Sequence, residues 1–146
     1  QIEQVFNNTF TNTTIKPFAS VLTDYAIYRS EKNKEEMFIH IDKMHFSLVY
    51  LKNKQFVFYN KFNFNNINDF LYYFTNCIHI LNIDQHNTKL NIISNLDKTH
   101  EYFNMIKDYM QNIIFLSKPD IFLYNHQLLD FQDHNNHHIF SQIICE

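Results

Sequence analysis

Residues 37–62, MFIHIDKMHFSLVYLKNKQFVFYNKF, decide the fold because apolar and polar side chains alternate along three successive runs. Period-two alternation is typical of strands that bury one face. It predicts strands at residues 37–42, 44–51 and 55–62. The polar residues 52–54 leave a short connection, so the second and third strands should form a hairpin.

Each predicted strand should gather its bulky side chains on one face, because alternate side chains point to the same side of a sheet. In the first strand the opposite side carries Phe38, His40 and Asp42. The gathered sets are Met37, Ile39 and Ile41 in the first strand, Met44, Phe46, Leu48 and Tyr50 in the second, and Phe56, Phe58 and Phe62 in the third.

Helical spacing occurs on both sides of these strands. Residues 14–29 and 98–110 place apolar side chains three and four positions apart, which predicts amphipathic helices. Residues 66–82 show the clearest helical period, with Asn66 as the expected N-cap. Asp97 is the expected cap of the helix at 98–110.

The remaining apolar runs complete the topology. Residues 89–94 and 113–116 are predicted to be strands, which gives the order α-β-β-β-α-β-α-β. Such an α/β chain forms a mixed sheet covered by helices, the arrangement of a ribonuclease H-like domain. Residues 121–124 are expected to be extended, and residues 137–145 to form a helix or a strand.

Length and composition limit the domain count and the function. A chain of 146 residues fits one domain, which we expect to span residues 14–146. Residues 1–13 are polar and are interpreted as an N-terminal segment or the remnant of a preceding lobe. The chain holds no glycine, although about ten would be expected at the usual frequency of about 7%. Phosphate loops that need glycine are therefore excluded, even if AT-rich codon bias caused the loss.

Charge and hydropathy exclude further classes. The 12 Lys and Arg residues are scattered among 15 Asp and Glu residues, whereas nucleic-acid binding needs clustered cations, so no nucleic-acid partner is expected. No apolar run is long enough to span a membrane, and the polar N-terminus does not match a signal peptide. We expect a cytoplasmic protein in which Cys77 and Cys145 are reduced thiols.

Residues 58–73, FYNKFNFNNINDFLYY, resemble a signature of an uncharacterised bacterial family with an actin-like ATPase fold. The signature consists of an Asn-Phe strand end followed by an Asp-Phe-aromatic-Tyr-Tyr helix start. Residues 138–140 and 145–146 also resemble the end of that family's sequences. The resemblance implies a two-lobed protein of which this chain is the C-terminal lobe.

The resemblance also locates the nucleotide-binding positions. Active actin-like ATPases have an Asp followed by a glycine-rich turn after the first strand of this lobe, and a glycine pair after the fourth. The matching residues here are Asp42 with Lys43, and Ser94 with Asn95, so the acid is retained and the glycines are replaced. A degenerate nucleotide site is expected, with no cofactor and no hydrolysis by this chain alone.

Several other residues could carry chemistry, and each also has a purely structural interpretation. Asp42 fits either a cleft carboxylate or a simple turn residue, and Asp69 and Asp97 fit helix starts better than a nuclease metal site. Cys77 is interpreted as a core or boundary thiol. Three histidines of the tail are weak candidates for a transition-metal site, with a solvated loop as the favoured interpretation: His134, His137 and His138.

Tyr72 and Tyr73 are adjacent on the predicted helix, so both side chains cannot enter one core. At least one of them should lie at a boundary, either packed under a loop or in contact with the missing lobe or a partner. The favoured hypothesis is a non-catalytic protein that acts in association or as a scaffold, and a homodimer is one form of it. The alternatives are an ATP-binding or phosphotransfer protein active only with an N-terminal lobe, and a plain domain of a larger complex.

Overall fold

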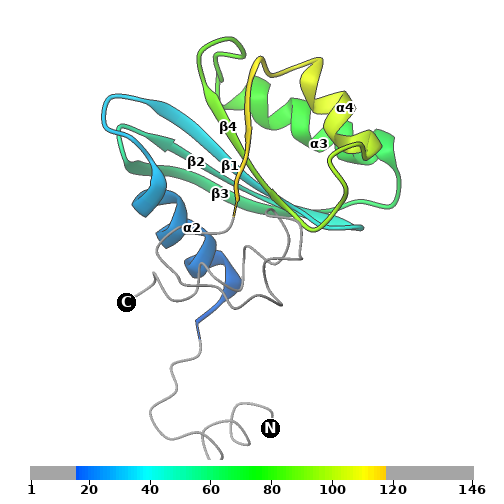
Figure 1. Ribbon diagram of the computed structural model, residues 1–146, viewed down its shortest axis with the longest axis horizontal. Coiled ribbons are helices and arrows are strands. Elements are labelled where there is room, and N and C mark those ends of the chain that lie inside the picture. Colours follow the sequence, from blue (N-terminus) through cyan, green and yellow to red (C-terminus); the bar gives the residue numbers. More distant parts are fainter. Residues whose placement is uncertain (1–15, 118–146) are drawn as a thin grey trace, which may run out of the picture.

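The computed structural model describes residues 16–117, and its element order is the predicted α-β-β-β-α-β-α-β (Figure 1). Predicted and observed elements overlap throughout this range. The elements are α2 (Phe18–Arg29), β1 (Glu35–Ile41), β2 (His45–Lys52), β3 (Gln55–Asn63), α3 (Ile67–Ile80), β4 (Lys89–Ser94), α4 (Glu101–Lys107) and β5 (Asn112–Phe115). The extended segment expected at 121–124 and the element expected at 137–145 lie outside the described residues.

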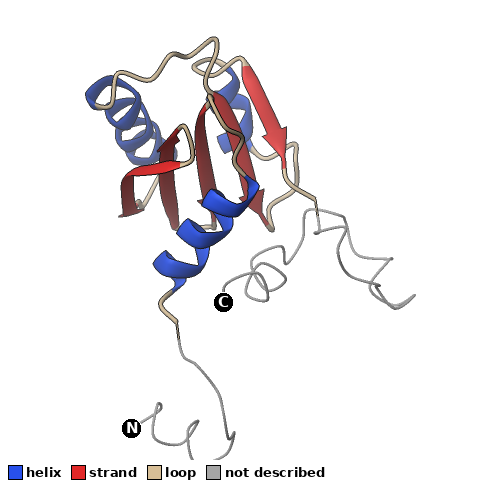
Figure 2. Ribbon diagram, turned by 90° about the vertical axis from the view of Figure 1, so that its left-hand side faces the viewer, coloured by secondary structure: helices blue, strands red, loops and turns tan. Residues whose placement is uncertain are grey.

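The five strands form one mixed sheet in the order β3-β2-β1-β4-β5. β1, β2 and β3 are antiparallel neighbours, whereas β4 pairs in parallel with β1 and with β5. The crossovers through α3 and α4 place both helices on the same face of the sheet, and α2 covers the other face (Figures 1 and 2). The predicted helix-covered mixed sheet is confirmed.

Alternation along the strands divides the core into two layers. Met37, Ile39 and Ile41 of β1 are buried beneath α3 and α4, whereas Phe38 is buried beneath α2. The aromatic side chains beneath α3 form one continuous cluster, in which Phe70 packs on the rings of Phe46, Phe64, Phe74 and Tyr102. The many phenylalanines of the sequence therefore build the core.

Two side chains predicted to share the buried faces do not do so. Met44 is 60% exposed because β2 begins one residue later, at His45, and Met44 lies in the turn. Phe56 is 51% exposed because a β-bulge shifts the register between β2 and β3, where Tyr50 pairs with Phe58 but Leu51 pairs with Phe56. The extra residue moves Phe56 to the face covered by α2.

The helix termini also differ in detail from the predictions. Asn66 caps α3 as predicted, since its side chain accepts a hydrogen bond from the N–H of Asp69. The expected cap of α4 was wrong, because the N-cap is His100 and the helix begins at Glu101. Asp97 instead closes the preceding turn by accepting hydrogen bonds from the N–H and the hydroxyl of Thr99.

Four non-glycine residues of the described range have a positive φ, and each ends an element or lies in a turn: Asn33, Asn53, Lys54 and Asn82. Asparagine tolerates this region better than most residues, which explains three of the four. Each helix within residues 16–117 is too short or too polar to cross a membrane.

Candidate functional site

The carboxyl ends of β1 and β4 lie side by side, since Ile41 pairs with Ser94 in the parallel register. In open sheets with parallel strands, ligands bind beyond the carboxyl ends of the strands. Residues 42–44 follow β1 and residues 95–100 follow β4. The structure therefore brings together the four positions predicted for a degenerate nucleotide site: Asp42, Lys43, Ser94 and Asn95.

Ser94 fastens the two strand ends to each other. Its side chain is buried, and Oγ donates a hydrogen bond to the Ile41 carbonyl at 2.7 Å. The same oxygen accepts a hydrogen bond from the N–H of Leu96 at 3.1 Å. Because the hydroxyl is buried and holds the backbone on both sides, Ser94 has a structural role here and is poorly placed to act as a nucleophile.

The turn after β1 satisfies its own backbone groups. The Asp42 N–H donates to the His45 carbonyl at 2.9 Å, and the Lys43 N–H donates to the Asp42 carboxylate at 2.7 Å. On the far side, the Tyr102 hydroxyl donates to the Lys43 carbonyl at 3.4 Å. A phosphate cradle needs several backbone N–H groups directed at the anion. In this turn the N–H groups of Asp42 and Lys43 are already hydrogen-bonded within the turn, and the exposed carboxylate of Asp42 lies beside them.

The carboxylates considered for a nuclease do not come together. Asp69 accepts hydrogen bonds from the Asn65 N–H and the Asn66 side chain at the start of α3, and Asp97 lies in the turn before α4. Within residues 16–117, no three His, Cys, Asp or Glu side chains are grouped closely enough to hold a metal ion. The weak tail candidates, His134, His137 and His138, fall outside the described residues.

Cys77 is a buried thiol on the inner face of α3. Burial raises its pKa to about 11, so the thiolate form is scarce at neutral pH. Its surroundings are apolar core side chains. The sequence predicted a core or boundary position for Cys77, and the structure places it in the core.

Tyr72 and Tyr73 lie at a boundary, as predicted, but in two different ways. The Tyr73 ring stacks on Phe62 of β3 with ring centroids 5.3 Å apart, whereas Tyr72 is 62% exposed. Both line a hollow of about 330 Å³ between α3 and the edge strand β3, together with the 74% exposed Ile80. The hollow is largely apolar and holds no charged side chain.

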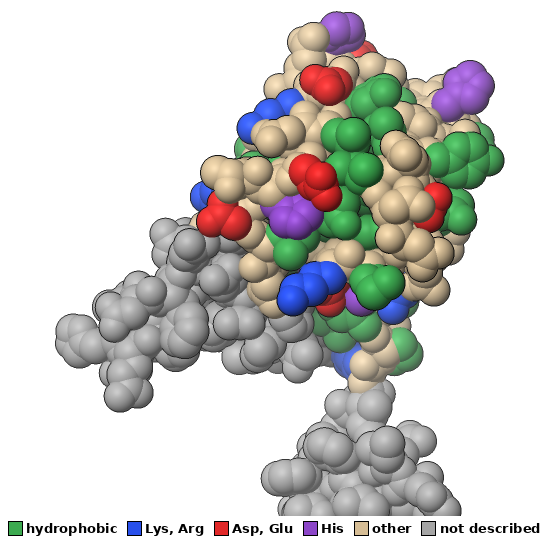
Figure 3. Space-filling model, turned by 90° about the vertical axis from the view of Figure 1, so that its right-hand side faces the viewer, with side chains coloured by type: hydrophobic (Ala, Val, Ile, Leu, Met, Phe, Trp, Pro, Cys, Tyr) green, Lys and Arg blue, Asp and Glu red, His purple; other side chains and the backbone are tan. Residues whose placement is uncertain are grey.

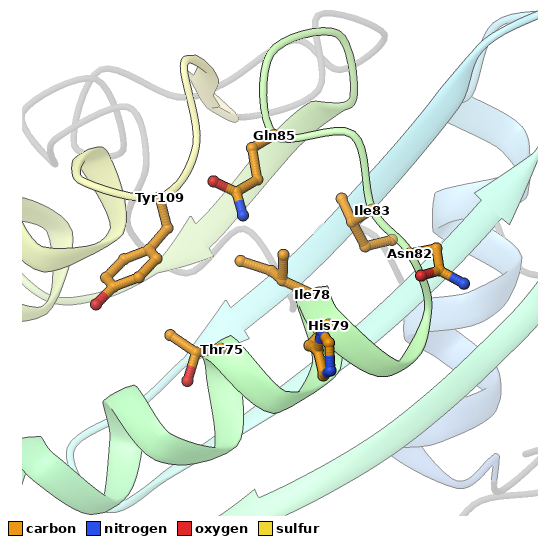
Figure 4. Close-up of a pocket in the computed structure, with 7 residues that line it drawn as sticks. All are labelled: Thr75, Ile78, His79, Asn82, Ile83, Gln85 and Tyr109. Carbon is orange, nitrogen blue, oxygen red and sulfur yellow. The ribbon is translucent and has the colours of Figure 1, made fainter.

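A smaller hollow of about 250 Å³ lies where the end of α3 meets the following loop and the end of α4 (Figure 4). No Lys, Arg, Asp or Glu lines it. On the face drawn in Figure 3, Lys and Arg side chains form separate spots and not a patch. Neither feature offers a strong anion site. The lining residues are Thr75, Ile78, His79, Asn82, Ile83, Gln85 and Tyr109.

The family model described as "Protein of unknown function (DUF3822)" matches residues 1–113. The chain belongs to this family. The structure is also similar to the crystal structure of a Bacteroides thetaiotaomicron protein described as having an actin-like ATPase fold and unknown function. The TM-score is 0.76 at 16% identity, and the match covers 99% of this chain and 51% of that one. No curated protein matches the chain.

These comparisons confirm the family and the fold expected from residues 58–73. The DUF3822 chain spans about half the length of its structural neighbour. Two features of this chain could not be predicted from its sequence. One is an ion pair between the buried Glu36, which lies two residues into β1 and outside the strand predicted at 37–42, and Lys89 at the start of β4. The other is the exposed edge formed by β3. A bulge in this strand moves Phe56 to the face covered by α2, and the alternation of the sequence does not reveal it.

Proposed function

We propose that this DUF3822 chain acts by binding another protein, as one half of an actin-like fold, and does not hydrolyse nucleotide. The observation that carries the proposal is the closed turn after β1. There the Asp42 and Lys43 N–H groups are engaged within the turn, and the carboxylate lies at its mouth. With no glycine in this turn, side chains block the close backbone approach that a phosphate-binding glycine turn allows.

The surface of the chain supports an association role. The hollow between α3 and β3 exposes Tyr72 and Ile80, and tyrosine is enriched at protein interfaces. The neighbouring structure supports it too, because the chain matches only half of a longer protein with the same fold. A complementary half, within the same polypeptide or a separate one, is therefore the partner class that we propose.

Calorimetric titration of the 146-residue chain with ATP and Mg²⁺ tests the absence of a nucleotide site. We expect no binding heat at millimolar nucleotide and no change on Asp42→Asn. The substitution removes the charge at the mouth of the turn while keeping a side chain of similar shape. Binding of the unaltered chain with a micromolar Kd would overturn the proposal.

The second candidate is an ATP-binding or phosphotransfer protein that works only with an N-terminal lobe. The observation in its favour is that Asp42 lies exposed at the end of β1, where the resemblance to actin-like ATPases places the retained acid. An Asp-x-Gly turn in the lobe that completes the fold would favour this candidate. ATP turnover by the joined lobes, lost in Asp42→Asn, would establish it.

A further inference from the structure

The strand β3 forms an edge of the sheet with backbone groups directed away from β2. The Phe64 N–H donates to the Met44 carbonyl at 3.1 Å, which fixes the phase of the antiparallel ladder. Backbone groups alternate in direction along a strand, so the N–H and C=O groups of Asn60 also point towards β2. Those of Tyr59 and Lys61 point away from β2, towards the open edge. The Lys61 N–H accordingly donates to the Asn60 side chain, at 2.9 Å, and not to β2.

Two hollows flank this edge, one on each face of the sheet. A strand added beside β3 would direct alternate side chains into one hollow and then the other, which is how added strands gain both affinity and specificity. The hollow under α3 has a volume of about 330 Å³ and the hollow under α2 about 310 Å³. The second hollow is lined by Ala19, Ser20, Thr23, Asp24, Phe56 and Tyr59.

We propose that β3 pairs with β3 of a second copy of this chain, antiparallel across a two-fold axis at Asn60. The inference rests on the proposed role in protein association, and it adds to the complementary half a second partner and the surface that binds it. Pairing would engage the outward N–H and C=O groups of Tyr59 and Lys61 in both copies at once, and the Lys61 N–H would exchange its bond to the Asn60 side chain for one to the Tyr59 carbonyl of the second copy. The two sheets would then become one continuous sheet of ten strands, twice the five found in one copy.

Three registers place the two-fold axis at Tyr59, Asn60 or Lys61. The bulge in β3 and the charge of Lys61 favour the register centred on Asn60. A two-fold axis at Tyr59 would set Lys61 against Val57, in the bulge where regular pairing ends. An axis at Lys61 would set two lysines directly opposite each other, which is unfavourable. An axis at Asn60 instead pairs Lys61 with Tyr59 of the second copy and Phe58 with Phe62 of the second copy.

The side chains on the α2 face are complementary in the register centred on Asn60. Lys61 of the second copy would lie over Tyr59, whose ring shares its hollow with Asp24. A lysine opposite a tyrosine and within reach of a carboxylate gains both a cation–π contact and an ion pair. Two-fold symmetry makes this contact twice, and Lys61 is the single charged residue of β3.

Sedimentation velocity of the full chain over a range of concentrations tests the pairing. Asn60→Asp places two carboxylates opposite each other at the axis, and we expect it to raise the dimer Kd about tenfold. Asn112→Asp is the matched control, because it makes the same change on the exposed start of β5 at the other edge of the sheet. Equal effects of the two substitutions would overturn the proposed surface.

A charge exchange tests the register. Lys61→Asp and Asp24→Lys should each weaken the dimer about tenfold, and the double variant should recover most of the loss. Lys98→Asp gives the same charge change as Lys61→Asp near Phe115 of β5, and it should leave the dimer unchanged. Absence of recovery in the double variant would overturn the contact between Lys61 and Asp24.

Crosslinking provides a test that does not depend on weakening the dimer. The two Asn60 positions would face each other as a pair without mutual backbone hydrogen bonds, in which Cβ atoms lie close enough for a disulfide. Asn60→Cys should therefore crosslink under mild oxidation, and Asn112→Cys should not. A chain that is monomeric throughout overturns the β3 pairing alone, whereas ATP binding would overturn the proposed function.

Discussion

The ammonium group of Lys89 lies 3.4 Å from Oε1 of Glu36, a carboxylate whose side chain is 1% exposed. The two residues face each other across the parallel pair β1 and β4. The second oxygen of Glu36 accepts a hydrogen bond from the Glu31 N–H at 2.7 Å, and Lys89 also pairs with Glu31. A buried charge is thus held by one cation and one backbone group, at the point where the α2–β1 loop meets the sheet.

Removing the cation should be costly. Lys89→Met leaves the Glu36 carboxylate buried without its ion pair, and we expect the free energy of unfolding to fall by about 3 kcal/mol. Lys32→Met, the same change at an exposed turn residue, should cost less than about 0.5 kcal/mol. Urea unfolding followed by circular dichroism measures both. Restoration by Glu36→Gln in the Lys89→Met background would show that the unpaired charge is responsible.

A second pair predicts how stability depends on alkaline pH. The Tyr50 hydroxyl donates to Oε2 of Glu35 at 2.5 Å, and burial together with this carboxylate raises the tyrosine pKa above its ordinary value of 10.0. The folded state therefore holds the proton more tightly than the unfolded state does. The resulting stability is fully present below about pH 10 and declines as pH rises above it.

Tyr50→Phe tests the contribution of that pair. We expect a loss of about 1 kcal/mol at pH 7, because a hydrogen bond to a partly exposed carboxylate is removed while the ring is kept. The decline in stability above pH 10 should become shallower in the variant. Unfolding midpoints at pH 7, 9 and 10.5 provide the measurement, and an unchanged alkaline slope would contradict the assignment to Tyr50.

The buried thiol of Cys77 should react slowly. Its pKa is raised to about 11 by burial, and the side chain is 6% exposed, so both the thiolate fraction and access are low. Labelling with iodoacetamide at pH 7.5, read as modification of the peptide that contains Cys77, should require unfolding. The rate should rise at least about 100-fold in guanidinium. Rapid labelling of the native chain would place Cys77 at the surface.

Most of the architecture could be predicted because burial enforces periodicity. The alternation of residues 37–62 predicted β1 to β3, and the helical period of residues 66–82 predicted α3, since each element buries one face. Periodicity does not reveal an inserted residue. The bulge beside Tyr50 leaves the phenylalanine spacing intact, so Phe56 was expected on the wrong face.

The site was less accessible to sequence reasoning. Asp42 and Ser94 were placed together through a resemblance, and the parallel register of β1 and β4 confirms that they lie at one end of the sheet. What the sequence could not show is how their hydrogen bonds are used. The buried bond from Ser94 to the Ile41 carbonyl depends on tertiary contact between segments far apart in the chain.

The absence of glycine predicts a simple stabilising substitution in the β2–β3 hairpin. Asn53 and Lys54 form its two-residue turn with φ of 53° and 66°, the pattern of a type I′ turn. Asparagine suits the first position, but a lysine in left-handed backbone costs about 1 kcal/mol. Lys54→Gly creates the preferred Asn-Gly turn, and we expect the free energy of unfolding to rise by about 0.5–1 kcal/mol.

Lys32→Gly is the control, because Lys32 lies in a turn without positive φ and glycine there should destabilise the fold. Thermal unfolding of both variants provides the comparison, and equal shifts in Tm would show that the conformation of Lys54 carries no strain.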